Sequence, residues 1–536
     1  MSASAAAARS PARTEPTAQE PHRALITGCA MTATLMQALD STIANVALPY
    51  MQGSLSATAD EITWVLTSYV IAAAIMTAPV GWMAVRFGRK RLFITCLVGF
   101  TVSSMLCGAA QSLEQIVAFR LLQGMCGAAL VPLSQATMLD IYPFERRAQA
   151  MAIFGMGVML GPILGPTLGG YLTEWYNWRW VFYVNLPFGI LAITGLALFM
   201  PKTSPKTELR FDWTGFGVLA LGIGALQLML DRGQDQDWFS TREIIIEAVL
   251  AALGIYLFIV HMLTAEKPFL APAVFRDRNF VCCMTLMFSV QMVLMSSSAL
   301  LAPYLQNLAG YPVSTAGLAM APRGIGTAAG MFLASHLALR LDQRKVMASG
   351  LLMLGWSLYV MSGWTPDVSR QELMATLVVQ GFGMGLVFNP MTVVAFTTLA
   401  PSLRGDATSM QALARNVGAA IGISVTTFML ARNMQTLHEE IGSYITPFNR
   451  ALQVGGSIGD YWIWEPVRGA LVTPQQGIAM LDRLVNHQAQ VIAYSNDYRM
   501  MALVVVPPLL LLLLMRRASR HGPPAAAPAP APAEAD

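Results

Sequence analysis

Apolar runs of about 20 residues recur along the whole of this 536-residue chain, and each is long enough to cross a bilayer as a helix. Lipid offers the backbone no hydrogen-bond partners, so a spanning segment of this length must satisfy its own polar groups as a helix. Charged residues make up only 12% of the chain, roughly half their share in soluble domains. The sequence therefore predicts an all-α membrane protein with many spans.

The apolar runs define fourteen candidate spans, with ends placed to within several residues. They cover about residues 25–47, 62–84, 91–110, 112–138, 147–172, 178–200, 213–231, 243–264, 279–303, 314–338, 345–364, 372–400, 405–432 and 496–515. Basic residues gather in every second connection, for example at Arg89, Arg147 and Arg344. Under the positive-inside rule, this alternation predicts that both termini are cytoplasmic.

The first and second halves of the chain share a sequence repeat. Gln123 returns as Gln380 and Gly161 as Gly418, at one offset (380 − 123 = 257; 418 − 161 = 257). A constant offset predicts duplicated six-span halves in the same orientation, arranged as six plus two plus six spans. The predicted units are a disordered cytoplasmic N-terminus (1–24), an N-terminal six-helix bundle (25–200), two inserted transmembrane helices with linkers (201–278), a C-terminal six-helix bundle (279–515) with a long external loop (433–495), and a disordered cytoplasmic tail (516–536).

One apolar segment carries a stripe of glycines flanked by prolines. The glycines are four residues apart: Gly157, Gly161, Gly165 and Gly169. In a helix they leave one face without side chains, which lets another helix approach closely. Pro162 and Pro166 each remove a backbone donor and bend a helix. A plain packing seam is one interpretation, but four glycines in register with two prolines favour a helix that moves or gates.

Asp40 and Arg120 are charges inside predicted spans. Asp40 lies about eight residues, or roughly 12 Å, from the outer end of its span, and Arg120 reaches a similar depth. Each costs roughly 2.5–3.5 kcal/mol at the centre of a bilayer, so each needs a partner or a wet cavity. They can form a static ion pair, or a proton-coupling pair whose carboxyl loads and releases a proton. The repeat positions are Ser297 and Leu377, so we expect the first half to handle the proton.

Further polar and flexible side chains are predicted to line a substrate cavity between the halves. Thioethers suit a pocket that accepts many apolar shapes, although any single methionine can equally belong to a core. The two cations in this set either attract anionic substrate groups or bond to backbone carbonyls, and both interpretations stay open. The predicted cavity residues are Asn45, Gln123, Gln291, Met292, Met295, Arg323 and Arg415.

Other function classes lack support in the sequence. The net charge of +4 is too small to argue for a nucleic-acid partner, and the six cysteines lack metal-ligand spacing. Metalloprotease, nucleophile-elbow and phosphate-binding-loop motifs are absent from the sequence. We therefore expect no enzyme activity, no metal and no cofactor, and an ion gradient as the energy source. One proton moving across about 100 mV supplies roughly 2.3 kcal/mol.

Several motifs resemble those of a known family. The stretch from Gly81 to Arg91 resembles the loop signature of the major facilitator superfamily, Arg120 to Gly124 its fourth-span signature, and Gly157 to Gly170 the antiporter signature of its drug exporters. Two stretches, Leu39–Pro49 and Trp178–Gly189, are similar to its fourteen-span drug:proton antiporter branch. Three further features are similar to the EmrB-like permeases: Leu226–Gly233, Asp237–Ser240 and the long external loop. The likeness covers about residues 25 to 515.

The resemblance implies a major facilitator fold and a multidrug efflux permease in the bacterial inner membrane. Such a permease exports hydrophobic or amphipathic toxic compounds in exchange for protons, with a periplasmic membrane-fusion adaptor and an outer-membrane channel as partners. By position, Asp40 and Arg120 would couple protons. The implied cytoplasmic gate is Gly81, Arg86, Gly88, Arg89 and Arg147, and the implied hinge is Gly157, Gly161, Pro162, Gly165, Pro166 and Gly169.

One position departs from that family, and other functions remain as alternatives. The superfamily loop usually has an acidic residue where Val85 stands, so a charge relay through that position cannot apply here. A dedicated metabolite or fatty-acid exporter, or an importer, is the alternative within the fold. A membrane-embedded acyltransferase or sensor is the alternative from another class.

Overall fold

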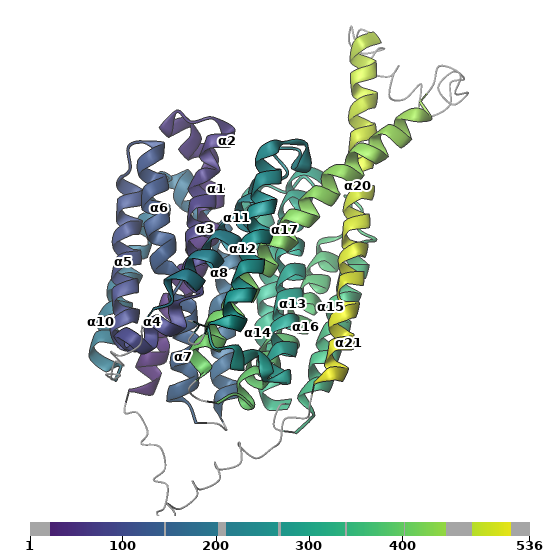
Figure 1. The fold of residues 1–536 in the computed structure, drawn as a ribbon. Coiled ribbons are helices and arrows are strands. Elements are labelled where there is room, and N and C mark those ends of the chain that lie inside the picture. Colours follow the sequence, from purple (N-terminus) through teal and green to yellow (C-terminus); the bar gives the residue numbers. More distant parts are fainter. Residues whose placement is uncertain are drawn as a thin grey trace, which may run out of the picture.

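The structure is a computed structural model. It describes residues 22–143, 146–201, 211–265, 268, 270–337, 340–400, 403–445 and 474–515. Every regular element in these ranges is a helix, and the helices form two bundles side by side (Figure 1). The predicted all-α class is confirmed.

The first bundle holds the elements that precede residue 201. They are α1 (Arg23–Leu55), α2 (Ala59–Ile62), α3 (Trp64–Thr77), α4 (Val80–Phe87), α5 (Arg89–Ala109), α6 (Leu113–Gly127), α7 (Leu130–Ile141), α8 (Arg147–Trp175), α9 (Trp180–Tyr183) and α10 (Asn185–Phe199). Helices α3 and α4 meet at a bend of 60°. Pro79 lies at this break, where a proline cannot donate a helical hydrogen bond.

The inserted pair and the second bundle follow. They comprise α11 (Trp213–Arg232), η2 (Trp238–Ser240), α12 (Arg242–Thr264), η3 (Pro272–Arg276), α13 (Arg278–Pro303), η4 (Tyr304–Leu308), α14 (Val313–Leu337), α15 (Gln343–Met361), α16 (Arg370–Thr397), α17 (Arg404–Ser443), α20 (Pro474–Val504) and α21 (Val506–Leu514). Helix α11 packs against α12, against α3 of the first bundle and against α17 of the second. The inserted pair therefore lies over the seam between the bundles.

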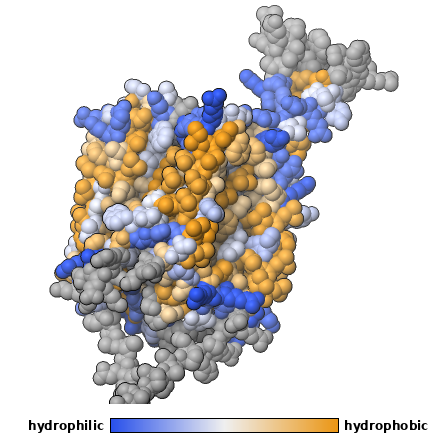
Figure 2. Space-filling model, in the orientation of Figure 1, coloured by the Kyte–Doolittle hydropathy of each residue, from blue (hydrophilic) through white to orange (hydrophobic). Residues whose placement is uncertain are grey.

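Nine helical segments of the described chain are long and apolar enough to cross a membrane, and the bent pair α3–α4 makes a tenth. Helices α1, α8, α14 and α15 are not among them, although at 33, 29, 25 and 19 residues they approach or exceed the length of a span. Figure 2 shows apolar side chains gathered over the middle of the bundles, with hydrophilic ones toward the ends. The count of fourteen spans and the domain boundaries stay predictions.

The internal repeat is visible in the packing. Helix α1 packs on α8 in the first bundle, and their repeat counterparts α13 and α17 pack on each other in the second. The glycine stripe of α8 forms this seam, because a Cβ at Gly161 would overlap Ala38 and one at Gly165 would overlap Thr42. Helix α8 is uninterrupted from Arg147 to Trp175, so its prolines do not end it. The side chains of Pro162 and Pro166 lie outside the described residues, and the hinge role stays a prediction.

The predicted loop 433–495 is partly helical. Helix α17 continues to Ser443, and α20 already begins at Pro474. Both rise beyond the bundle at the upper right of Figure 1, where His438 and Asp482 lie 3.0 Å apart. The prediction took only the apolar part of each helix as a span, whereas the helical periodicity continues into more polar sequence. Residues 446–473, with Tyr461, Trp462 and Trp464, and the predicted disordered ends 1–21 and 516–536 lie outside the described residues.

Candidate functional site

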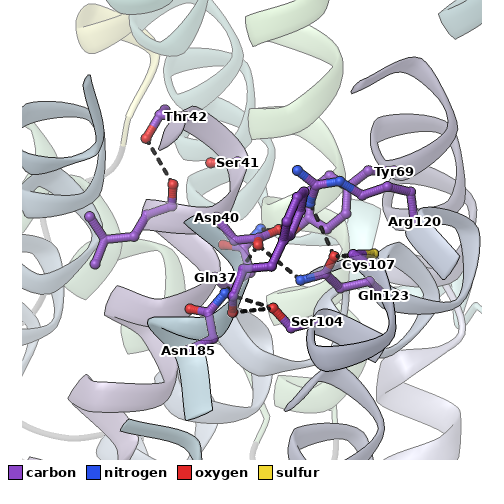
Figure 3. Close-up of polar contacts among 12 residues, drawn as sticks. Gln37, Asp40, Ser41, Thr42, Tyr69, Ser104, Cys107, Arg120, Gln123 and Asn185 are labelled. Carbon is purple, nitrogen blue, oxygen red and sulfur yellow. Dashed lines mark hydrogen bonds and ion pairs between the residues drawn. The ribbon is translucent and has the colours of Figure 1, made fainter. Parts of the chain in front are cut away.

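The two charges predicted to pair lie in direct contact inside the first bundle. Arg120 of α6 donates from Nη1 to Asp40 Oδ2 of α1 at 2.7 Å (Figure 3). Each residue is only 1% exposed. A buried ion pair is favourable only when the remaining polar atoms of both groups are also satisfied, so their further partners decide its properties.

Two amides complete the carboxylate's contacts. Gln123 donates from Nε2 to Asp40 Oδ1 at 2.9 Å, and Asn185 of α10 donates from Nδ2 to the same oxygen at 3.2 Å. Asn185 also donates to Ser104 Oγ of α5 at 3.0 Å. Helices α6 and α10 thus contact the carboxylate of α1 directly, and α5 joins the network through the bond of Ser104 to Asn185 (Figure 3). Asn185 and Ser104 were missed as site residues. The signal for Asn185 was an amide between apolar stretches of the Trp178–Gly189 motif.

Arg120 is less completely satisfied than its partner. Its guanidinium carbon lies 4.6 Å from the ring centroid of Phe182 and 5.3 Å from that of Tyr69. Ring faces attract a cation without accepting all of its hydrogen bonds. Nε and Nη2 of Arg120 are buried and have no hydrogen-bond partner. Nη1 also donates to Gln123 Oε1 at 3.1 Å. If Asp40 lost its charge, the guanidinium would therefore keep this neutral acceptor and lose its charged one.

The second bundle contains an uncharged counterpart of this site. Gln380, the repeat of Gln123, donates from Nε2 to Ser297 Oγ, the repeat of Asp40, at 3.1 Å. Leu377, at the repeat position of Arg120, is buried and apolar. The repeat thus preserves the amide contact between two helices and omits both charges, as the aligned residues imply.

The bundles touch at the end that carries Arg89, Arg147 and Arg404, which we call the basic end. A Cβ at Gly81 would lie 2.7 Å from the backbone carbon of Gly405, so α4 and the start of α17 approach backbone to backbone. Only a residue without a side chain permits this contact. The bundles are held closed at this end, which is the lower one in Figure 1.

Ionic contacts accompany this closure. Asp140 of α7 pairs with Arg89 and lies 3.9 Å from Arg404 of the second bundle. Asp140 was missed by the sequence analysis. Asp140 gives the basic end an acidic partner that Val85 cannot provide. Asp140 follows Arg89 by 51 residues, so only the packing of the helices brings the two side chains together.

The other predicted gate residues also lie at the basic end. Arg147 donates from Nε to the carbonyl of Leu139 at 3.1 Å. Gly88 has a φ of 85°, a conformation that favours glycine, between α4 and α5. Arg86 is half-buried, and its Nη1 has no hydrogen-bond partner. Their role as a gate stays a prediction.

Comparison with known proteins decides the family. The family model of the Major Facilitator Superfamily matches residues 30–423. This chain belongs to the major facilitator superfamily. The sequence-based assignment is confirmed, and with it a multi-pass membrane protein of a transporter family.

Individual members of the superfamily are similar over most of their length. The multidrug export protein EmrB of Escherichia coli (strain K12) is 33% identical over 475 residues, which cover 88% of this chain and 91% of the relative. The fatty acid resistance protein FarB of Neisseria gonorrhoeae is 34% identical over 422 residues, covering 78% and 83%. The crystal structure of the human organic anion transporter MFSD10 matches with a TM-score of 0.56 at 14% identity, covering 92% of this chain and 100% of that chain. At this identity the last likeness shows the fold alone.

The predicted substrate-cavity residues of this superfamily member lie in both bundles. Arg323 donates to Ser298 Oγ at 2.9 Å and to the carbonyl of Leu294 at 3.3 Å, which favours the backbone-bonding interpretation for this cation. Gln123 lies in the Asp40 contacts described above. The others differ in exposure: Gln291 is buried, Met292, Met295 and Arg415 are half-buried, and Asn45 is exposed. Their contact with a substrate stays a prediction.

The described residues contain no group of three or more His, Cys, Asp or Glu side chains that could hold a metal ion. All six cysteines are free thiols in the structure.

Proposed function

We propose that this chain is a multidrug efflux permease that exports hydrophobic or amphipathic toxic compounds by alternating access in exchange for protons. The similarity to EmrB over 88% of the chain supports the drug-export part. The observation that carries the proton-coupling part is the buried ion pair of Asp40 and Arg120, in which two guanidinium nitrogens lack partners.

A proton arriving on Asp40 removes the charge that holds Arg120. The guanidinium, buried beside Phe182 and Tyr69, then keeps the neutral amide oxygen of Gln123 and must find a second acceptor or reach water. Helix α1 carries Asp40 and packs along the glycine stripe of α8, so a shift of α1 is passed to a helix that also contacts α14 and α16 of the second bundle. In this mechanism, protonation at Asp40 favours separation of the bundles at the basic end.

Transport in purified form tests this mechanism. The protein is reconstituted into liposomes, a proton gradient is imposed, and uptake of a fluorescent hydrophobic cation is followed. We expect Asp40→Asn to reduce gradient-driven transport to the level of empty liposomes. The matched control is Ser297→Ala at the uncharged counterpart, which should transport normally. Wild-type transport by Asp40→Asn would remove this residue from the coupling mechanism.

A dedicated fatty-acid exporter is the second candidate. The 34% identity to FarB over 78% of the chain favours it. The same liposome assay with a long-chain fatty acid and a hydrophobic cation separates the candidates. Transport of the fatty acid alone would replace multidrug export with the narrower function.

The proposal includes an inner-membrane location with cytoplasmic termini, and a periplasmic adaptor with an outer-membrane channel as partners. The projecting ends of α17 and α20 support a docking role, because they extend beyond the apolar band (Figures 1 and 2). Glu439 and Glu440 are exposed there. Reversing both charges to lysine should preserve transport in liposomes and reduce whole-cell resistance when the adaptor is present. Equal losses in both assays would contradict docking through this face.

A further inference from the structure

A second carboxyl is buried in the second bundle, where the sequence places no counterpart of Asp40. Asp497 of α20 is 1% exposed. Asn433 of α17 donates from Nδ2 to its Oδ1 at 3.0 Å, while Oδ2 is buried without a hydrogen-bond partner. No ion pair reaches Asp497 among the residues that the structure describes. The sequence analysis did not single out this residue, which lies at the edge of the last predicted span, 496–515.

The groups around Asp497 come from several elements. Tyr494 and Tyr498 stand beside it on α20, and the ring of Tyr304 from η4 lies 5.6 Å from that of Tyr494. Tyr498 is fully buried and its hydroxyl has no partner. Arg323 of α14 bonds to Ser298 Oγ and to the carbonyl of Leu294, and forms no ion pair with the carboxyl of Asp497 among the described residues. Directly after α15, the carbonyl of Ser362 is an uncharged group that accepts from Ser495 at 2.5 Å.

This environment differs from that of Asp40 in a way that matters for protons. Asp40 faces a guanidinium and two amides, whereas Asp497 receives one neutral hydrogen bond. A buried carboxylate without a cation is costly, and a proton on the unpartnered oxygen removes the charge. The hydrogen bond from Asn433 to Oδ1 remains possible in both forms. The site can therefore exist with or without the proton while keeping its contact to α17.

We propose that Asp497 is a second proton-binding residue of the transport cycle, located in the bundle that lacks the Asp40–Arg120 pair. The proposal deepens the proton coupling proposed above and rests on it. Asp497 would exchange protons at the end of the bundle from which α17 and α20 project, opposite the basic end.

Helix α17 links this acid to the contact between the bundles. Near its start, Gly405 meets Gly81 and Gln411 accepts a hydrogen bond from Gln135. Near its other end, Asn433 contacts Asp497. The two ends are separated by about 42 Å at 1.5 Å per residue (433 − 405 = 28 residues). Loading or removing the proton changes the charge of the group that Asn433 contacts, and α17 is one continuous helix from that contact to the closed end.

Infrared difference spectroscopy of the purified full-length protein tests the proposal directly, because protonated carboxyl groups have a carbonyl stretching band that carboxylates lack. Spectra are recorded across a pH titration for the wild type, Asp497→Asn, Asp40→Asn and the structural control Ser495→Ala. We expect Asp497→Asn to lose the part of the titrating band that Asp40→Asn and Ser495→Ala retain. A band unchanged in Asp497→Asn overturns the proposal.

Two additions keep the outcome clear. Asp497→Glu retains an acid, so its titrating band should persist at a shifted frequency even if Asp497→Asn fails to fold. An unshifted band in Asp497→Glu also overturns the proposal. Proton release per substrate is then measured in liposomes, where we expect a lower ratio for Asp497→Asn than for the wild type. If the wild type itself shows no proton-driven transport, the proposed function fails. The spectra still decide whether Asp497 titrates.

Discussion

Gln135 of α7 donates a 2.9 Å hydrogen bond to Gln411 of α17, joining the two bundles through a pair of buried amides. The two residues are 276 positions apart and are 3% and 2% exposed. A neutral hydrogen bond contributes only about 0.5–1.5 kcal/mol net. Such a bond can help to hold the basic end closed and still break in each cycle, which a stronger buried ion pair could not do as readily.

Removing this amide pair should open the basic end more often. We expect Gln411→Leu to increase the population with separated bundles several-fold, since about 1 kcal/mol corresponds to roughly a fivefold change in an equilibrium. Distances between spin labels at Arg146 and Arg340, both at that end, measure the populations. The control is Thr137→Val, because the Thr137 hydroxyl bonds to the carbonyl of Leu133 on its own helix and not across the bundles within the described residues. Identical distance distributions in Gln411→Leu and the wild type would contradict a closing role.

Removing one charge of the buried Asp40–Arg120 pair should destabilise the protein more than removing both charges. Asp40→Leu leaves Arg120 buried without its charged acceptor and with the neutral Oε1 of Gln123 as its remaining one, which we expect to cost about 3–5 kcal/mol of stability. The double variant Asp40→Leu/Arg120→Met removes both charges and should recover most of that loss. Thermal unfolding in detergent, followed by tryptophan fluorescence, measures both. Neither variant should transport against a gradient. A double variant no more stable than the single would mean that Arg120 is solvated in the folded protein.

The glycine stripe of α8 makes a steric prediction that has a matched control. A single methyl group at Gly161 overlaps the backbone of Ala38, so Gly161→Ala should lower the unfolding temperature and reduce transport. Gly28 lies in α1 with nothing within 4 Å of an added Cβ. Gly28→Ala should therefore be neutral, or stabilising by up to about 1 kcal/mol through helix propensity. Equal unfolding temperatures and transport for the two alanine variants would show that the contact between α1 and α8 can accommodate an added methyl group.

Asp140 should matter more than an ordinary surface acid. Asp140→Asn weakens contacts to Arg89 and Arg404 together, so we expect less closure at the basic end and slower transport. Glu243→Gln removes another partly exposed ion pair, with Arg232. Because a single exposed pair contributes only about 0–1 kcal/mol, this control should transport at nearly the wild-type rate. Transport rates of the two variants are compared in liposomes at low salt. Equal rates would mean that Asp140 contributes no more than an ordinary surface charge.

Many features of this protein could be predicted because they depend on short stretches of the sequence. A span of about 20 apolar residues needs a helix wherever it occurs in lipid, so the all-α class follows from hydropathy alone. The depth of Asp40 and Arg120 in their spans made each a candidate partner for the other. The constant offset of the repeat placed Ser297 and Gln380 at the positions of Asp40 and Gln123, and the structure shows that they are in contact.

Other features depended on which helices pack together. Asn185 reaches Asp40 from 145 residues away, and Gln135 meets Gln411 from 276 residues away. No periodicity in the sequence specifies such contacts, because they depend on the relative rotation and depth of separate helices. The early part of α20 was recognised as an amphipathic run at near-helical spacing, and was assigned to the external loop because it is too polar for a span.

The sequence by itself determined the membrane-spanning helical class, the duplicated halves and the charged residues inside the spans, because chain length, hydropathy and residue chemistry fix them. Only the tertiary structure decided that Asp40 has two amide donors, that Asp140 links the bundles, and that Asp497 lies buried beside Asn433. These are contacts between distant helices, and their energies depend on distance and burial that exist only once the helices have packed.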